Sequence, residues 1–258
     1  MRRTPVPHPP ALPKEFSELF SRGRVFDSSC SPEARVLYLE RDGGYYLKRA
    51  PKGTLRREYE MTAYFHARGL SVEPLAYLCE GEDYLLTRAA IGEDATDRRY
   101  LAEPRRLAEW LGTTLRALHS LEAADCPVPD RTATYLDTVY EGYRIGRFDA
   151  SFSPVAGITP EAALAEVRAA APALTSRVLL HGDYCLPNLM LDGWRLSALI
   201  DLGAAGIGDR HIDLFWGAWT LCFNLGTDDY RNRFFDAYGR EEVDPCLIRA
   251  IGFAECFG

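Results

Sequence analysis

The sequence predicts an α+β fold, in which a small antiparallel sheet with one helix precedes a larger, mainly helical part. Four short strands are expected within the first 90 residues, amphipathic segments follow from residue 104, and one short hairpin interrupts them near residue 190. With 258 residues, of which 47% are hydrophobic, the chain can bury a sizeable core. We therefore predict two lobes, residues 1–90, opening with a Pro-rich arm (1–16), and residues 91–258.

The first lobe begins with a hairpin. Val36, Tyr38 and Glu40 alternate with leucines, and the Asp42-Gly43-Gly44 segment turns the chain into a second strand that carries Lys48 near its end. Thr54 is a candidate cap for a helix that Gly69 ends. In chain order the expected elements are strands at 36–40 and 45–49, a helix at 54–69, and strands at 75–79 and 84–87.

Helical patterns dominate the second lobe. Leu107, Leu111, Leu115 and Leu118 recur at helical spacing, which predicts one amphipathic helix over about 104–121. We expect residues 123–134 and 142–160, both rich in turn formers, to break the chain into short pieces bordering a substrate site. The remaining expected elements are a helix opened by Thr159-Pro160-Glu161, a buried strand at 178–180, a hairpin turned by Asp192-Gly193, and helices over about 209–225, 227–238 and 244–256.

Composition narrows the classes of function. The net charge of −7 and the pI of about 5.4 argue against a nucleic-acid or anionic-membrane surface and suit a neutral or cationic small molecule. The most apolar run, 214–223, is about half of the roughly 20 residues that a membrane span needs, and the N-terminal arm does not read as a secretory signal. Seven cysteines without a CxxC pair indicate reduced thiols and a cytoplasmic protein, and the scattered histidines give no support to a zinc site. We expect a monomer or weak dimer.

The strongest chemical signal is the segment His181-Gly182-Asp183-Tyr184-Cys185-Leu186-Pro187-Asn188, followed thirteen residues later by Asp201-Leu202-Gly203. Asp183 is suited to orient an acceptor hydroxyl and to take its proton. Asn188 and Asp201 offer the oxygen ligands that Mg²⁺ prefers. The alternative is that each Asp only caps a turn. These groups come after a part of the chain with strands, a lysine and a helix that carries Glu. The combined pattern predicts phosphoryl transfer by a kinase.

These motifs closely resemble those of the aminoglycoside phosphotransferases, above all the 3'-phosphotransferases (kanamycin kinases), which are relatives of protein kinases. The likeness covers the chain from about residue 25 to its end. It is carried by His181 to Asn188, Ile200 to Gly203, Gly206, Asp209, Asp213-Leu214 and the tail Ala254-Glu255-Cys256-Phe257. The resemblance implies a two-lobed, protein-kinase-like fold that uses ATP and Mg²⁺.

The resemblance also implies roles in nucleotide binding. Lys48 would hold the α- and β-phosphates, with Glu58 as its carboxylate partner and Glu60 as the fallback. Tyr46 would lie along the adenine. The simpler alternatives are a solvated lysine on a strand and a tyrosine that packs across strands.

Three further positions follow from the same resemblance. The segment 87–92 resembles the hinge that pairs with adenine through its backbone, which marks Arg88 and Ala90. The segment 27–33 takes the place of the phosphate loop, with Ser31 as the expected contact and an ordinary polar turn as the alternative. His181 and Asp213 are interpreted as supports of the catalytic turn, and His119 as a packing residue.

The acceptor side departs from the family pattern. Ala204 stands where the 3'-enzymes usually have Arg, and the helical stretch 214–224 carries no charge. Its aromatic residues are either a hydrophobic core face or a different acceptor pocket. Glu255 falls where the family's C-terminal acid reaches a sugar amine, although Gly258 lengthens the tail. We assign Glu255, Phe257 and Asp149 to the substrate site.

The sequence thus predicts an ATP-dependent enzyme that phosphorylates the 3'-hydroxyl of an aminoglycoside and confers antibiotic resistance. Ala204 and the uncharged helix keep a second interpretation open, a kinase of the same fold acting on another sugar, amino alcohol or antibiotic. The third, a nucleotide-binding pseudokinase, is disfavoured because every group that the chemistry needs is present.

Overall fold

The computed structural model describes residues 3–7, 11–30 and 34–258. It confirms the α+β class, with an antiparallel sheet and many helices. The chain forms two compact units, Met1–Asp94 with Pro187–Gly203, and Ala95–Leu186 with Ala204–Gly258. The segment Pro187–Gly203, which we expected in the second lobe, therefore groups with the first unit. No helix in the described part of the chain has the length and apolar character of a membrane span.

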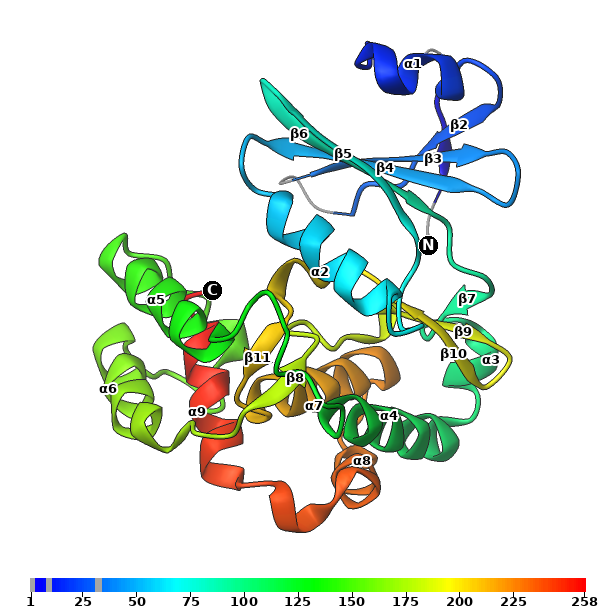
Figure 1. The fold of residues 1–258 in the computed structure, drawn as a ribbon. Helices are drawn as coiled ribbons and strands as arrows, with labels where there is room; N and C mark the ends of the chain where they lie inside the picture. Colours follow the sequence, from blue (N-terminus) through cyan, green and yellow to red (C-terminus); the bar gives the residue numbers. More distant parts are fainter. Residues whose placement is uncertain (1–2, 8–10, 31–33) are drawn as a thin grey trace. The chain divides into compact units, whose positions relative to one another are not determined.

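The first unit is built on an antiparallel sheet in the order β1-β2-β3-β4-β6-β5 (Figure 1). Its strands are β1 (Thr4–Pro5), β2 (Arg24–Asp27), β3 (Arg35–Glu40), β4 (Tyr45–Pro51), β5 (Pro74–Glu80) and β6 (Glu82–Arg88), and its helices are α1 (Lys14–Phe20) and α2 (Arg56–His66). The predicted hairpin is confirmed, with Tyr38 opposite Tyr46 and Val36 opposite Lys48.

Strand alternation gives the sheet two different faces. Leu37, Leu39 and Leu47 pack with Phe16 and Phe20 of α1 in a buried cluster. Because successive side chains point to opposite faces, Tyr38, Tyr46 and Lys48 project from the other face. Figure 1 shows α1 and α2 on opposite sides of the sheet.

The start of α2 corrects one sequence-based expectation. The Thr54 hydroxyl does not cap the helix; it donates to the carbonyl of Pro51 at 2.6 Å. Instead, the buried Asp83 of β6 accepts the Leu55 N–H at 2.9 Å. A carboxylate supplied by a neighbouring strand thus satisfies a free N–H at the helix start, a partner that the local sequence does not show.

A second sheet completes the first unit. It consists of β7 (Glu93–Asp94), β9 (Leu189–Asp192) and β10 (Arg195–Leu199), in the order β10-β9-β7. The predicted Asp192-Gly193 turn joins β9 to β10, and Gly193 adopts φ 63°. A Cβ on Gly92 would lie 1.9 Å from the Leu191 carbonyl oxygen, so only glycine allows the chain to pass β9 this closely.

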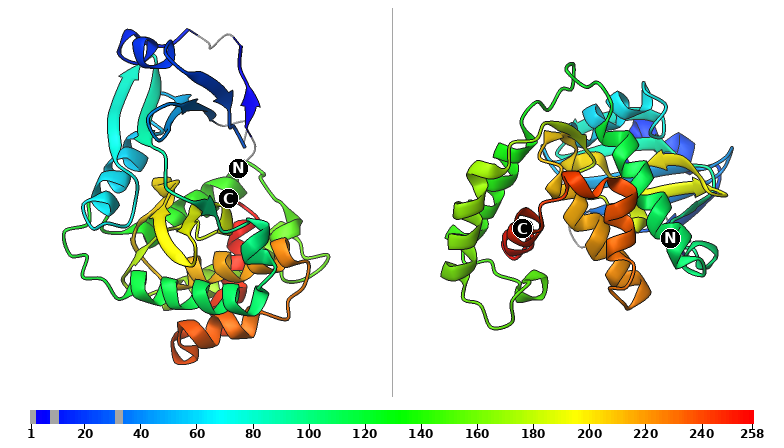
Figure 2. Two further views of the ribbon diagram at one scale, coloured as in Figure 1. Left: turned by 90° about the vertical axis from the view of Figure 1, so that its right-hand side faces the viewer. Right: turned by 90° about the horizontal axis from the view of Figure 1, so that it is seen from below.

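The second unit is mainly helical. It contains α3 (Arg98–Leu101), α4 (Pro104–His119), α5 (Arg131–Arg144), α6 (Pro160–Ala170), α7 (His211–Leu225), α8 (Arg231–Tyr238) and α9 (Pro245–Glu255), with the strand pair β8 (Val178–Leu180) and β11 (Gly206–Gly208). Figure 2 shows α4, in green, beside the orange-red α8. Leu107, Leu111 and Leu115 are fully buried, which confirms the predicted amphipathic face of α4.

Helix α5 was not predicted. We expected short pieces before and after it, yet 14 residues form one helix whose N–H of Ala133 is capped by Asp130 at 3.2 Å. Its apolar positions, Tyr135 and Val139, join the core that contains the C-terminal tail. Gly142 lets the tail come close, since a Cβ there would lie 1.9 Å from the Phe257 carbonyl oxygen. Tertiary packing therefore stabilises a helix that local composition did not indicate.

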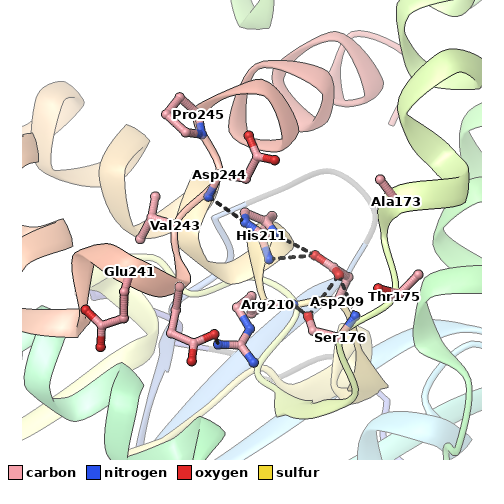
Figure 3. Close-up of a pocket in the computed structure, with 11 residues that line it drawn as sticks. Ala173, Thr175, Ser176, Asp209, Arg210, His211, Glu241, Val243, Asp244 and Pro245 are labelled. Carbon is pink, nitrogen blue, oxygen red and sulfur yellow. Dashed lines mark hydrogen bonds and ion pairs between the residues drawn. The ribbon is translucent and has the colours of Figure 1, made fainter.

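Asp209 anchors the start of α7, as Figure 3 shows. It accepts hydrogen bonds from the Ser176 hydroxyl at 2.8 Å and from His211 Nδ1 at 2.7 Å. His211 Nε2 in turn accepts the Asp244 N–H at 3.0 Å. Burial alone would raise the pKa of Asp209, but the hydrogen bonds from His211 and Ser176 hold it below its ordinary value. The polar groups of this network are paired with one another, so we interpret it as a structural connection between α7 and α9.

Candidate active site

The first unit contains a pocket of about 630 Å³, a size typical of small-ligand sites. Its walls come from the face of the sheet opposite α1 and from the end of the β9–β10 hairpin. The lining includes Arg3, Ser28, Val36, Tyr38, Tyr46, Lys48, Glu58, Leu85, Arg88, Ala90, Asn188 and Asp201. The sequence analysis marked seven of these residues, although they are far apart in the chain: Tyr46, Lys48, Glu58, Arg88, Ala90, Asn188 and Asp201.

Lys48 is the electrostatic centre of this pocket. Its ammonium group donates to Glu58 at 2.8 Å and to Asp201 at 2.7 Å. Burial would lower the pKa of Lys48, but the carboxylates of Asp201 and Glu58 raise it above its ordinary value. Lys48 therefore stays protonated and carries a fixed positive charge, which suits a phosphate ligand.

Helix α2 positions both the lysine and the loop that carries Asp201. Glu58 is buried and holds Lys48, while Arg57 Nε donates to the Gly203 carbonyl at 2.6 Å. Asp201 adopts φ 61°, a left-handed conformation that Asp tolerates better than most residues but that still stores strain. One turn of α2 thus fixes the Asp-Leu-Gly segment and its lysine together.

Asn188 and Asp201 meet at the open end of the β9–β10 hairpin. Leu189 pairs with Leu199, and the Ile200 N–H then donates to the Asn188 carbonyl at 3.0 Å. Asn188 and Asp201, the residue after Ile200, both line the pocket. The hairpin therefore gathers one amide and one carboxylate oxygen donor, which the predicted spacing of thirteen residues had suggested.

The predicted catalytic turn, residues 181–183, lies in the second unit. Gly182 adopts φ 85°, and a Cβ there would lie 1.9 Å from the Ala204 carbonyl oxygen, so glycine is required. His181 Nδ1 accepts the Asp183 N–H at 3.3 Å. This agrees with the predicted supporting role of His181. Asp183 itself is half-buried. Burial of the Cys185 thiol raises its pKa, and the nearby carboxylate of Asp183 raises it further.

Asp213 holds the predicted catalytic turn through two backbone hydrogen bonds. Its carboxylate accepts the His181 N–H at 2.8 Å and the Gly182 N–H at 2.7 Å. His119 Nε2 lies 3.1 Å from the same carboxylate, and His119 Nδ1 lies 2.9 Å from the Tyr238 hydroxyl. Since a carboxylate only accepts, His119 donates to Asp213 from Nε2. The predicted scaffold role of Asp213 and the packing role of His119 agree with this geometry.

Glu255 ends α9 and is half-buried in the second unit. Its carboxylate accepts a hydrogen bond from the Tyr135 hydroxyl at 2.8 Å. Burial raises its pKa to about 7; the hydrogen bond from Tyr135 opposes this, and the nearby charge of Asp183 adds to it. A carboxylate beside Asp183 that titrates near neutral pH is suited to meet a cationic group.

Comparison with known proteins decides the family. The model of the phosphotransferase enzyme family matches residues 24–247. The chain belongs to this family. It is 44% identical over 249 residues to a probable aminoglycoside 3'-phosphotransferase of Lactococcus lactis, covering 96% of this chain and 95% of that protein. This confirms the predicted membership of the aminoglycoside phosphotransferase group and shows that the chain is a phosphotransferase enzyme.

Solved structures support the fold of this phosphotransferase. An aminoglycoside-3'-phosphotransferase of type VIII superposes with a TM-score of 0.73 at 24% identity, covering 90% of this chain and 92% of that one. An aminoglycoside phosphotransferase of Streptomyces rimosus, solved in complex with ADP and streptomycin, superposes with a TM-score of 0.67 at 22% identity, covering 90% of each chain. The likeness confirms the predicted fold class.

Arg88 and Ala90, the two positions predicted to belong to the adenine hinge, both line the pocket. The Arg88 N–H donates to the Glu73 carbonyl at 2.9 Å, and the Arg88 guanidinium lies 4.5 Å from the centre of the Tyr45 ring. That amide is therefore engaged within the sheet. Ala90 lies two residues further along the pocket wall. Backbone recognition of a base remains a prediction for this segment.

The three other predicted contacts have different outcomes. Ser31 lies outside the described residues. The Asp149 carboxylate accepts the Ser151 N–H at 2.9 Å, and the Asp149 N–H donates to Cys256 at 2.7 Å, so Asp149 holds the tail and its substrate role stays a prediction. The Phe257 ring is fully buried in the core against Tyr143 and Phe148, and its substrate role also stays a prediction.

Sequence reasoning missed several residues that position the site. Tyr135, which holds Glu255, lies on the unpredicted helix α5, and Arg57, which holds Gly203, was passed over beside Glu58. Arg3 lines the pocket, but it falls in the Pro-rich arm, for which the sequence predicts no role in the site. The one available signal was the position of Arg57 in the same helical turn as Glu58; the other two depend on contacts between distant segments.

The ion pair of Lys48 gives a testable expectation. Replacing Glu58 by Gln keeps the shape but removes the charge, so Lys48 loses one of two carboxylates, and we expect the KM for ATP to rise roughly tenfold, about 1.4 kcal/mol. Steady-state kinetics measure this. Glu60→Gln is the matched control, because Glu60 pairs with Arg56 on the surface of the same helix. An equal effect of both substitutions would contradict the assignment of Glu58.

Proposed function

We propose that this phosphotransferase moves the γ-phosphate of ATP to the 3'-hydroxyl of an aminoglycoside antibiotic. The observation that carries the proposal is Lys48, which is held between Glu58 and Asp201 in the pocket that Asn188 also lines. A fixed cation beside two oxygen donors suits a nucleotide polyphosphate. The names of the relatives support the antibiotic as acceptor.

In the proposed nucleotide site, Lys48, Glu58 and Tyr46 have separate roles. Lys48 binds phosphate oxygens as a point charge, and Glu58 keeps the ammonium group in place. Tyr46 lies on the same strand face two residues before Lys48, which suits a base or ribose next to the phosphates. The relative of Streptomyces rimosus, solved with ADP, supports ATP as the donor.

Asn188 and Asp201 fit a magnesium ion. One amide oxygen and one half-exposed carboxylate at the end of a hairpin form the sparse oxygen set that Mg²⁺ accepts when phosphates and water complete its shell. When bound, the ion neutralises charge that develops on the transferred phosphoryl group. Asp201 also contacts Lys48, so the two residues share the same phosphate end of the pocket.

The acceptor hydroxyl is assigned to Asp183. Its carboxylate accepts the hydrogen bond of the hydroxyl, orients it, and takes its proton as the new P–O bond forms and the bond from the γ-phosphorus to the ADP oxygen breaks. The turn around it is rigid because Asp213 binds the two preceding N–H groups. Glu255, held by Tyr135, would bind an ammonium group of the acceptor.

The direct test is ADP release with a panel of aminoglycosides, followed by phosphorus NMR of the product. We expect turnover well above the ATPase background with kanamycin or neomycin, and phosphate on the 3'-oxygen. No turnover across the panel would overturn the acceptor class. Phosphate on a different hydroxyl would overturn the assigned position.

The titration of Glu255 predicts a pH dependence. As the pH rises through about 7, Glu255 ionises and the KM for a cationic acceptor should fall. Glu255→Gln should raise that KM roughly tenfold or more at pH 8 and flatten its pH profile. Kinetics between pH 6 and 8.5 measure both effects, with the exposed Glu161→Gln as control. A profile unchanged by Glu255→Gln would contradict the contact.

The same group affects stability with a definite sign. Because the pKa of Glu255 is raised in the folded state, the folded protein holds this proton more tightly than the unfolded chain does. The contribution of Glu255 to the free energy of unfolding is therefore present below about pH 4.5 and lost as the pH rises to about 7. The free energy of unfolding of Glu255→Gln, measured by urea denaturation, should not show this decrease between about pH 4.5 and pH 7.

One observation favours a second acceptor class. Trp216, Trp219 and Phe223 form a run of ring contacts along the uncharged stretch 214–224 of α7, with Trp219 stacked on Phe223 at 4.9 Å, and Phe223 is 70% exposed. Such a wall suits a less cationic acceptor, such as another sugar, amino alcohol or antibiotic. A metabolite library assayed for ADP release separates the two, since turnover of aminoglycosides alone would eliminate this alternative.

The setting of the reaction forms part of the proposal. All seven cysteines are free thiols, as expected of a cytoplasmic enzyme. We propose that it acts there as a monomer or weak dimer, which gel filtration with light scattering would test.

A further inference from the structure

The N-terminal arm contributes to the nucleotide pocket. The sequence predicts only a Pro-rich arm over residues 1–16, but Thr4 and Pro5 pair with Asp27 and Phe26 as the edge strand β1. The Val6 N–H also donates to the Val25 carbonyl at 2.9 Å. Backbone pairing with β2 therefore fixes the direction of the arm and the face to which its side chains point.

Strand alternation places Arg3 on the pocket face. Pro5 is paired with Phe26, and Phe26 with Tyr38, so these three residues share one face of the sheet. Arg3 lies two residues before Pro5 and therefore points to the same side. The lining of the pocket contains both Arg3 and Tyr38, in agreement with this register.

The guanidinium of Arg3 is bound to two tyrosines. Its carbon atom lies 3.5 Å from the centre of the Tyr38 ring, within cation–π distance. Its Nη2 donates to the Tyr46 hydroxyl at 2.9 Å. The Tyr38 and Tyr46 rings are themselves 5.0 Å apart. Arg3 thus holds together the aromatic pair that neighbours Lys48.

The register also locates Arg3 along the nucleotide. Val36 and Lys48 form one cross-strand pair, and Tyr38 and Tyr46 form the next pair on the same face. Two residues along a strand span roughly 6.5 Å. If Lys48 binds the phosphates, the tyrosine pair lies at the ribose and base, and Arg3 lies with it.

We propose that Arg3 is a nucleotide-binding residue that acts at the ribose and base end of the pocket. This inference rests on the proposed nucleotide site. Arg3 fixes the Tyr46 ring, and its remaining N–H donors and its charge face a ligand that carries hydroxyls, ring nitrogens and a polyanion. In a chain with a net charge of −7, this cation also makes the pocket more favourable for ATP.

The test compares Arg3→Ala with the unchanged protein in ADP binding by calorimetry and in steady-state kinetics. We expect the Kd for ADP and the KM for ATP to rise about three- to tenfold, with kcat within twofold. Arg3→Lys, which keeps the charge but not the planar group, should give a smaller rise. Tyr46→Phe, which removes the hydrogen-bond acceptor, should reproduce part of the Arg3→Ala effect.

Arg22→Ala is the matched control, because Arg22 pairs with Glu18 on the exposed surface of α1. It should leave both constants unchanged. Wild-type constants in Arg3→Ala, or tighter binding as expected if the arm obstructs the pocket, would overturn the inference. The proposed function fails separately, if the unchanged protein neither binds ADP nor transfers phosphate.

Discussion

Replacing Asp183 by Asn should lower kcat by roughly 10²- to 10⁴-fold, because the acceptor hydroxyl then loses the group that takes its proton. The KM for ATP should stay within about twofold, since Lys48, Glu58 and Asn188 are unchanged. Single-turnover kinetics measure the first effect, and ADP binding by calorimetry measures the second. The two readouts distinguish lost chemistry from lost nucleotide binding.

The control for this prediction is Asp192→Asn. Asp192 is an exposed aspartate in the β9–β10 turn, where Asn serves the Asx-Gly turn equally well. It should leave kcat unchanged. If Asp183→Asn retained more than a tenth of the wild-type kcat, the proton acceptor would have to be another group, and the mechanism proposed above would be wrong.

Replacing Asp213 by Ala should lower the free energy of unfolding more than any other substitution considered for this protein. Asp213→Ala leaves the His181 and Gly182 N–H groups and His119 without their shared acceptor, and Asp213 is fully buried. Loss of one member of a buried, hydrogen-bonded charge network costs about 3–5 kcal/mol. Urea denaturation at pH 7 measures the change in the free energy of unfolding.

Asp236→Ala provides the comparison, because Asp236 on the exposed surface of α8 pairs with Arg240, which follows the helix. This substitution should change the free energy of unfolding by no more than about 0.5 kcal/mol. Asp213→Asn should fall between the two, since an amide offers a single acceptor oxygen. Equal losses in Asp213→Ala and Asp236→Ala would show that the carboxylate does not hold the catalytic turn.

The sequence could predict elements whose signals are local. The alternation around Tyr38 and Tyr46, the leucines of α4 and the Thr159 cap of α6 are all confirmed, because strand and helix periods and end caps depend on neighbouring residues. The helix α5 and the Asp83 cap of α2 could not be predicted. Each depends on a partner that lies far away in the chain, the C-terminal tail for α5 and strand β6 for α2.

For the active site, the sequence by itself determined which chemical groups are present. Asp183, Asn188 and Asp201 follow from residue types and spacing, since phosphoryl transfer requires an acceptor for a proton and oxygen ligands, and the family resemblance implies Lys48 as the cation. Only the tertiary structure decided how these groups are held. Asp213 under the turn, Arg57 on Gly203, Tyr135 on Glu255 and Arg3 on Tyr46 are contacts between distant segments, and a hydrogen bond across such a distance in sequence has no local pattern.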